Sequence, residues 1–262
     1  MPRFAANLTL MFTELPFLDR FAAAARAGFE AVEFLFPYDH PAEAVAERLR
    51  ANGLAQALFN LPPGDWAAGE RGLGALPERR DEMRAKFAEA VPYIRATGTP
   101  CVHLMAGKTD RSAPHAAAFR DAVAWTAGRL ADLGVTLVLE PLNTRDNPGY
   151  HLVDFDEAAA LVRDLALPNL KLQFDLYHCQ ILHGDVTRRL EAAMPIVGHI
   201  QIASVPSRNE PDGEELNFPY LFDLVDRLGY GGFVGCEYRP RGRTEDGLGW
   251  FAPYRAGLGV TP

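Results

Sequence analysis

The sequence predicts an α/β protein built as a single closed (β/α)₈ barrel over residues 1–262. Eight short apolar segments alternate with helical segments along the chain, and most of the helical segments end at a glycine. The apolar segments are hydrophobic on both faces, as is typical of parallel strands that helices cover on each side. About 250 residues of such units are the usual size of one closed barrel.

The strand candidates are apolar runs bounded by turn residues, and in chain order they cover 4–8, 29–36, 54–60, 99–105, 135–143, 170–178, 199–203 and 233–240. The helix candidates between them cover 14–28, 40–53, 79–98, 115–134, 156–168, 186–198 and 220–232. In the first helix Phe17 and Phe21 fall on one face before Gly28 ends it, and Gly53 and Gly98 end the next two. The repeating unit is therefore a helix, a stop and a strand.

An open, doubly wound sheet is the alternative arrangement of the same elements. That fold usually carries a GxGxxG phosphate-binding turn after its first strand, and no such motif stands there. The composition also does not shift anywhere along the chain in a way that would mark a domain boundary. We therefore expect the closed barrel.

Composition narrows the classes of partner. Lys and Arg total 26 against 34 Asp and Glu, the net charge is −8, and no basic block could follow a nucleic-acid backbone. The three cysteines are far apart and form no CxxC pair, which suits a reducing compartment. Arg3, Asn7 and Glu14 interrupt the N-terminal segment before a signal peptide or membrane span develops. We expect a cytoplasmic protein without nucleic-acid or membrane partners.

Four polar residues stand at or near the ends of predicted strands five to eight, namely Glu140, Asp175, Gln201 and Glu237. The carboxyl ends of all strands in a barrel open onto one face, so these side chains should converge. Three carboxylates packed this closely repel one another unless a cation lies among them. All-oxygen ligands favour Mg²⁺ or Mn²⁺, and no HExxH motif indicates a zinc hydrolase. Taken singly, each acidic residue could instead be a helix cap or a salt-bridge partner.

Glu140 and Glu237 belong to strands five and eight and could approach a small ligand from different sides. One carboxylate could then remove a proton from carbon and the other return it, while a metal polarises the neighbouring carbonyl and stabilises an enediolate. The alternative is that both residues are ligands and that water or another residue is the base.

Several segments spread over nearly the whole chain resemble the hydroxypyruvate isomerase family, one of the xylose-isomerase-like barrels. They are FLFPYDH (34–40), FNLPPGDWAAGERG (59–72), AGKT (106–109), LEPLN (139–143), FDLYHCQ (174–180), GHIQIASVPSRNEPDGEELNF (198–218) and GCEYRP (235–240). The resemblance implies a divalent metal held by Glu140, Asp175, Gln201 and Glu237, with Glu140 and Glu237 as the acid/base pair.

The reaction implied by the resemblance is the isomerisation of hydroxypyruvate to tartronate semialdehyde, or of a 2-oxo-tetronate in closely similar members. More distant relatives are ketose 3-epimerases, which usually have His where Gln201 stands, so Gln201 favours the isomerases. Dimers and tetramers are common among similar barrels, and a homo-oligomer is therefore possible.

Further candidates lie on the same face. Lys108 and Arg208 could bind the carboxylate of an oxo acid, or be solvated loop charges. His178 could donate a hydrogen bond to substrate or orient a ligand, or serve the structure alone. Asn7 and His103, like Glu33 and Asn60, stand at or near strand ends and could line the pocket.

The segment after the third strand is long and rich in Gly and Pro, which indicates a lid. It contains Trp66, Glu70 and Arg71. A lid that excludes water would protect a reactive enediolate. A rigid surface loop packed against a neighbouring subunit is the alternative.

Three other functions compete with an isomerase. A ketose 3-epimerase would use the same chemistry on free sugars. A metal-dependent endonuclease would need a richer His and Asp cluster and a basic face, which 7 His and a charge of −8 do not supply. A non-catalytic sugar-acid binder would tolerate the loss of Glu140 or Glu237.

Overall fold

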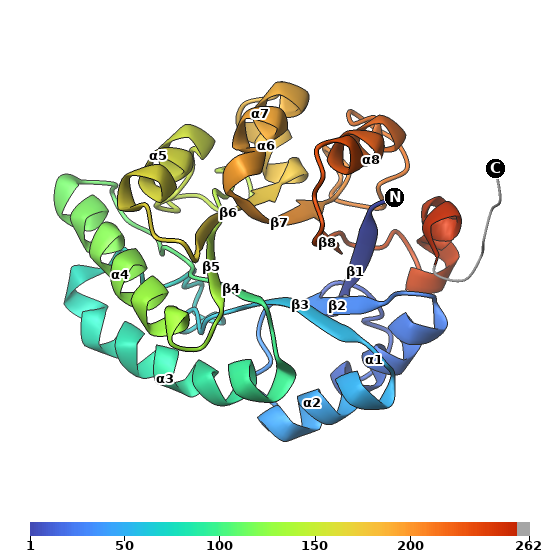
Figure 1. The fold of residues 1–262 in the computed structure, drawn as a ribbon, viewed down its shortest axis with the longest axis horizontal. Helices are drawn as coiled ribbons and strands as arrows, with labels where there is room; N and C mark the ends of the chain where they lie inside the picture. Colours follow the sequence, from blue (N-terminus) through green and yellow to red (C-terminus); the bar gives the residue numbers. More distant parts are fainter. Residues whose placement is uncertain (256–262) are drawn as a thin grey trace.

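The computed structural model describes residues 1–255, which form one closed barrel of eight parallel strands in the order β1 to β8 (Figure 1). Each strand pairs with the next in the chain, and β8 pairs with β1 to close the ring. The strands are β1 (Arg3–Asn7), β2 (Ala31–Phe34), β3 (Ala55–Asn60), β4 (Cys101–His103), β5 (Thr136–Leu139), β6 (Leu170–Asp175), β7 (Val197–Ile202) and β8 (Phe233–Cys236). The predicted fold class is confirmed.

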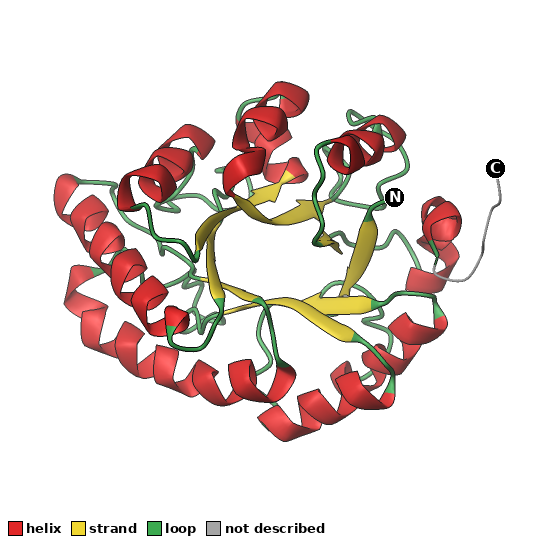
Figure 2. Cartoon of the chain, viewed as in Figure 1, coloured by secondary structure: helices red, strands yellow, loops and turns green. Residues whose placement is uncertain are grey.

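Helices form an outer ring around the strands (Figure 2). They are α1 (Phe17–Arg26), α2 (Ala42–Ala51), α3 (Arg80–Thr97), α4 (Ala113–Ala131), α5 (Phe155–Leu165), α6 (Leu176–Leu182), α7 (Val186–Ala193) and α8 (Phe218–Arg227), with 3₁₀ turns η1 (Pro77–Arg79), η2 (Met194–Ile196) and η3 (Thr244–Tyr254). Within residues 1–255, no helix combines the length and apolar character needed to cross a membrane.

The 3₁₀ segment η3 follows β8 and lies beside β1, in the place of an α-helix after the last strand (Figure 1). Phe4 of β1 makes edge-to-face contacts with Phe222 of α8 and with Trp250 and Phe251 of η3, at centroid distances of 5.0, 5.2 and 5.9 Å. Truncating a buried phenylalanine to alanine costs about 3–5 kcal/mol. This aromatic cluster therefore fastens the end of the described chain to its beginning.

Most predicted elements differ by a few residues at their ends, and two of these differences have a clear local cause. The strand predicted over 170–178 ends at Asp175, because its Oδ1 accepts a hydrogen bond from the backbone N–H of Tyr177 (2.8 Å) and so caps helix α6. The helix predicted over 186–198 ends at Ala193, and Pro195, which has no N–H to donate, lies in the 3₁₀ turn before β7. The first change matters for the site, since Asp175 joins a strand to a helix.

Candidate active site

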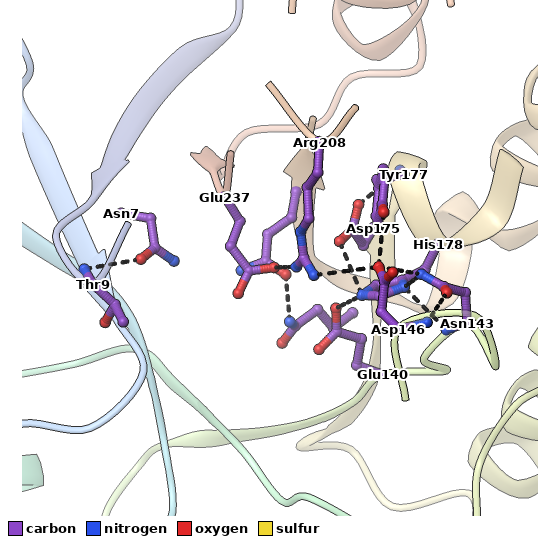
Figure 3. Close-up of polar contacts among 12 residues, drawn as sticks. Asn7, Thr9, Glu140, Asn143, Asp146, Asp175, Tyr177, His178, Arg208 and Glu237 are labelled. Atoms are coloured by element: carbon purple, nitrogen blue, oxygen red, sulfur yellow. Dashed lines mark hydrogen bonds and ion pairs between the residues drawn. The ribbon is translucent and has the colours of Figure 1, made fainter. Parts of the chain in front are cut away.

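Three carboxylates and a histidine meet at the carboxyl end of the barrel (Figure 3). Glu140 directly follows β5, Asp175 is the last residue of β6, Glu237 directly follows β8, and His178 lies in the first turn of α6. One oxygen or nitrogen atom of each lies within 4.8 Å of those of the other three. The carboxylate residues are 5, 1 and 6 % exposed, respectively. The predicted convergence of Glu140, Asp175 and Glu237 is therefore present.

Burial and mutual repulsion favour the protonated forms of these carboxyl groups. Burial and then the charges of Glu237 and Asp175 raise the pKa of Glu140 well above its ordinary value. Burial and Glu237 raise the pKa of Asp175 to about 7. Burial also raises the pKa of Glu237, although Arg208 opposes the shift. The protein by itself thus supplies too little positive charge for this cluster.

Arg208, in the loop after β7, is held by acidic and aromatic neighbours. Its Nη2 donates to Oε2 of Glu237 (2.7 Å), and its Nη1 lies 3.8 Å from Oδ2 of Asp146. The guanidinium carbon lies 4.9 Å from the ring centroid of Tyr177, whose hydroxyl donates to Asp146 (2.7 Å). Arg208 also has a φ of 59°, a strained value for a residue with a Cβ. The guanidinium of Arg208 thus lies beside Glu237 at the cost of a strained backbone conformation.

His178 is a hydrogen-bond donor toward the cluster. The backbone N–H and the side-chain amide of Asn143 both donate to its Nδ1, at 3.0 and 2.7 Å. Burial and then Arg208 lower the pKa of His178 well below its ordinary value, so the ring is neutral and carries its proton on Nε2. That Nε2 lies 3.6 Å from Asp175 Oδ2 and 3.8 Å from Glu140 Oε1. A nitrogen that carries a proton has no free lone pair for a metal ion, which leaves the three carboxylates as the candidate ligands of this cluster.

Gln201 lies on β7 within a buried polar network. Its Nε2 donates to Oε1 of Glu33 (2.8 Å), and its Oε1 accepts from Nε2 of Gln173 (2.6 Å). Glu33 also accepts from Asn7 (2.9 Å) and binds Nε2 of His199 (2.6 Å). Because a carboxylate can only accept, Glu33 fixes which end of the Gln201 amide faces it. A role of Gln201 as fourth metal ligand stays a prediction.

A cavity of about 310 Å³ opens above Glu140 and Glu237. Loops after β1, β2, β3, β4, β5, β7 and β8, together with α6, contribute to its wall. Its lining residues are Thr9, Leu10, Leu35, Asn60, Trp66, Arg71, Met105, Glu140, Leu142, Asp146, Asn147, His178, Arg208, Glu237 and Arg239. The volume suits a small organic acid or sugar with its first waters.

Other predicted site residues lie outside this lining, among residues 1–255. Lys108 is exposed. Asn7 and His103 are buried, and Nδ1 of His103 lies 3.6 Å from Oε2 of Glu140. Glu70 pairs with Arg79 and accepts from the backbone N–H of Asp65 (2.6 Å), so it fastens the loop that carries Trp66 and Arg71.

Sequence reasoning missed several residues near the cluster, notably Asn143, Asp146, Tyr177 and Arg239. Asn143 and Asp146 belong to the long, Asn- and Pro-containing loop between β5 and α5, and the length of that loop was a usable signal. Arg239 stands two residues beyond Glu237 and lines the cavity. It falls within the GCEYRP segment (235–240), but the sequence analysis gave it no role.

The chain is similar to known proteins over nearly its whole length. A family profile described as xylose isomerase-like TIM barrel matches residues 21–254. The chain is 54% identical to a 2-oxo-tetronate isomerase of Cupriavidus necator over 257 residues, which cover 97% of this chain and 99% of that protein. It is 42% identical to a hydroxypyruvate isomerase of Escherichia coli, covering 97% of this chain and 100% of that one. A crystal structure from Brucella melitensis, described as an AP endonuclease of family 2, superposes with a TM-score of 0.95 at 52% identity, covering 97% and 100% of the two chains.

Proposed function

Because this chain belongs to the hydroxypyruvate and 2-oxo-tetronate isomerase family of xylose isomerase-like TIM barrels, we propose that it isomerises a small 2-oxo hydroxy acid by proton transfer between adjacent carbons. Hydroxypyruvate and a 2-oxo-tetronate are the two candidate substrates. The single observation that carries the proposal is the cluster of Glu140, Asp175 and Glu237 beneath a small cavity, in a chain so similar to these isomerases.

The cluster fits a divalent metal. Oε1 of Glu140 and Oδ2 of Asp175 are buried and have no hydrogen-bond donor among the described residues, although buried carboxylate oxygens normally have one. Glu140, Asp175 and Glu237 would hold the ion, Gln201 is the proposed fourth ligand, and the all-oxygen set suits Mg²⁺ or Mn²⁺. When bound, such an ion polarises a substrate carbonyl and compensates negative charge that develops on oxygen.

Glu140 and Glu237 are the proton-transfer pair in this proposal. One carboxylate removes a proton from C3 of hydroxypyruvate, which gives an enediolate across C2 and C3, and a carboxylic acid then delivers a proton to C2. The C3 hydroxyl loses its proton as the aldehyde forms, while the C2 oxygen gains one, so atoms and charge balance. The raised pKa values of both glutamates suit groups that must both accept and donate a proton near neutral pH.

Neighbouring residues direct this chemistry. Arg208 binds Oε2 of Glu237 and so restricts the rotation of that carboxylate. His178 presents its Nε2–H beside Glu140 and Asp175, where it can donate a hydrogen bond to a substrate oxygen. Trp66 and Arg71, on the loop after β3, cover part of the cavity and would limit the access of water to the enediolate.

Ketose 3-epimerisation and endonuclease action find less support. Gln201 stands where ketose 3-epimerases that resemble this chain usually have His. The Brucella structure is described as an endonuclease. Within residues 1–255, however, one group of His, Cys, Asp and Glu could hold a metal, and the net charge of −8 opposes binding to a phosphate backbone.

Proton exchange in D₂O tests the proposal. The protein is incubated with hydroxypyruvate, 2-oxo-tetronates, and free ketoses such as psicose and tagatose, with added Mn²⁺ or with EDTA. We expect enzyme-dependent deuterium incorporation at C2 or C3 of an oxo acid, and none in EDTA. Exchange at C3 of a free ketose without reaction of any oxo acid would refute the proposal in favour of an epimerase.

A further inference from the structure

Three arginines line the cavity, and they differ in how their charge is balanced. Arg208 is paired with Glu237 and lies near Asp146. Arg71 and Arg239 form no ion pair with any carboxylate among residues 1–255, and Arg239 is exposed whereas Arg71 is half-buried. A half-buried cation without a counter-ion in a cavity is a suitable place for a substrate anion.

The guanidinium of Arg71 is already held in position. Its carbon lies 3.7 Å from the ring centroid of Trp66, and Trp66 packs edge-on against Phe36 at 5.0 Å. Nη1 donates to the backbone carbonyls of Glu70 (2.7 Å) and Trp66 (3.4 Å). The hydrogen bonds that Arg71 makes within residues 1–255 use Nη1, so Nε and Nη2 have no protein acceptor there. A ligand carboxylate would therefore bind a guanidinium that is already ordered, and little further conformational entropy would be lost on binding.

The backbone next to Arg71 is equally constrained. Gly72 has a φ of +114°, and a Cβ there would lie 2.2 Å from the carbonyl oxygen of Met105. The carbonyl of Arg71 accepts from the N–H of Gly107 (3.1 Å), and Gly72 forms a β-bridge with Ala106. This loop is thus pinned against the segment after β4, and Arg71 enters the cavity from a fixed base.

The charges around the cavity indicate where a carboxylate can go. Glu140, Asp146 and Glu237 make the part of the lining near the ends of β5 and β8 negative, and an anion placed there meets repulsion. Arg71 follows β3, which is diametrically opposite β7 in the ring of eight strands, while Arg208 follows β7. In hydroxypyruvate the reacting atoms are C2, C3 and their oxygens, so the carboxylate lies at one end of the molecule and can be bound apart from the reaction.

We propose that Arg71 binds the carboxylate of the substrate through Nε and Nη2 and thereby selects 2-oxo acids over neutral ketoses of the same length. This inference rests on the proposed function, because it assigns one end of the proposed substrate. It gives the loop after β3 a role in specificity beyond covering the site. Lys108 and Arg208, the candidates from sequence, are respectively exposed outside the cavity lining and paired with Glu237.

Kinetics on a matched pair of substrates tests Arg71. Hydroxypyruvate and dihydroxyacetone have the same three-carbon frame, but a carboxylate in one is a hydroxymethyl group in the other. We expect Arg71→Gln to lower kcat/KM for hydroxypyruvate by about 10- to 100-fold, mainly through KM, because a hydrogen bond to a charged group is lost. Turnover of dihydroxyacetone should change by less than about twofold, and Arg71→Lys should recover part of the loss because it keeps the charge.

Arg145→Gln is the control, since Arg145 is exposed at the same end of the barrel and does not line the cavity. It should leave both substrates nearly unaffected. An equal loss on both substrates in Arg71→Gln would mean that the loop itself was damaged, and an equal effect of Arg145→Gln would mean general electrostatics. Either result overturns the assignment, as does unchanged kinetics in Arg71→Gln.

Calorimetric binding separates this inference from the proposed reaction. D-Glycerate, a reduced analogue of hydroxypyruvate, should bind the wild-type protein more tightly than glycerol, and Arg71→Gln should weaken glycerate binding by a factor similar to the kinetic one. If no oxo acid is turned over and yet glycerate binding depends on Arg71, the proposed function fails and the anion site stands. Glycerate that binds the wild type no better than glycerol, or binds Arg71→Gln equally well, overturns the anion site.

Discussion

Asp175→Asn should make the metal-free protein more stable than the wild type, and the gain should grow with pH. Asp175 is 1 % exposed, and its Oδ2 has no hydrogen-bond donor within the described chain. Asparagine has nearly the same shape and keeps an Oδ1 that can accept from the N–H of Tyr177 and cap α6. The substitution therefore removes the buried charge and little else.

The size of the effect follows from the pKa of Asp175. Burial and Glu237 raise that pKa to about 7, whereas an unfolded chain ionises aspartate near about 3.9. The protonated form is thus favoured in the folded state, and the folded protein loses stability as pH rises from the unfolded pKa through the folded one. The loss is about 1–2 kcal/mol at pH 5 and about 4 kcal/mol at pH 8, and it vanishes below about pH 3.

Urea unfolding of the chelator-treated protein measures this difference. Wild type and Asp175→Asn are compared at pH 5 and pH 8, and the free energy of unfolding of the variant should be higher by about 1–2 and about 4 kcal/mol, respectively. Asp223→Asn is the control, because Asp223 is exposed on α8 and its side chain makes no hydrogen bond or ion pair with other residues in 1–255. It should leave stability unchanged within about 0.5 kcal/mol at both pH values.

Two results would refute this reasoning. One is a variant that is less stable than the wild type at pH 8, since Asp175 would then have a favourable partner in the metal-free protein. The other is a difference independent of pH, which would trace the effect to packing. Added Mn²⁺ provides a second check, because it should raise the melting temperature of the wild type more than that of Asp175→Asn, which lacks one ligand.

Three further outcomes are expected. Glu140→Gln should keep the fold by circular dichroism but lose at least about two orders of magnitude in kcat, and wild-type turnover would remove it from proton transfer. Exhaustive dialysis against EDTA should abolish turnover, and Mg²⁺ or Mn²⁺ should restore it; full activity after chelation would exclude a required ion. Gly235→Ala should lower the stability of the protein by about 1–3 kcal/mol in thermal unfolding, because the new Cβ would lie 2.2 Å from Oε2 of Glu33. The control Gly128→Ala has open space around the new Cβ and should be neutral or stabilising.

The barrel was predictable from the sequence because its signals are local. Apolar runs and helix-ending glycines such as Gly28 and Gly98 mark most units. Eight such units without a GxGxxG turn favour the closed barrel that the structure has. Strand ends then place Glu140, Asp175 and Glu237 together, because parallel strands finish on one face. The exact ends of the elements were less predictable. Strand β6 ends and helix α6 begins at Asp175 because of a single side-chain hydrogen bond.

What sequence could not provide is how side chains pair across the barrel. Lys108 and Arg71 both stand in polar, glycine-containing loops, and only their three-dimensional setting separates an exposed amine from a stacked guanidinium in the cavity. Asp146 becomes relevant because Arg208 and Tyr177 reach it from other elements. Such pairings depend on loop conformation, which short-range patterns do not specify.

The buried carboxylates of this barrel differ in whether the protein supplies hydrogen-bond donors to them, and this difference bears on function. Glu33 receives hydrogen bonds from Asn7 and Gln201 and contacts His199 at 2.6 Å. The same fold therefore has the means to satisfy a buried carboxylate with protein donors. In the cluster at the carboxyl end of the barrel, Glu140 and Asp175 keep oxygens without any donor in the described chain, at a cost in stability. Since donors could have been supplied there too, the deficit is best explained by a positive ligand that comes from outside the chain.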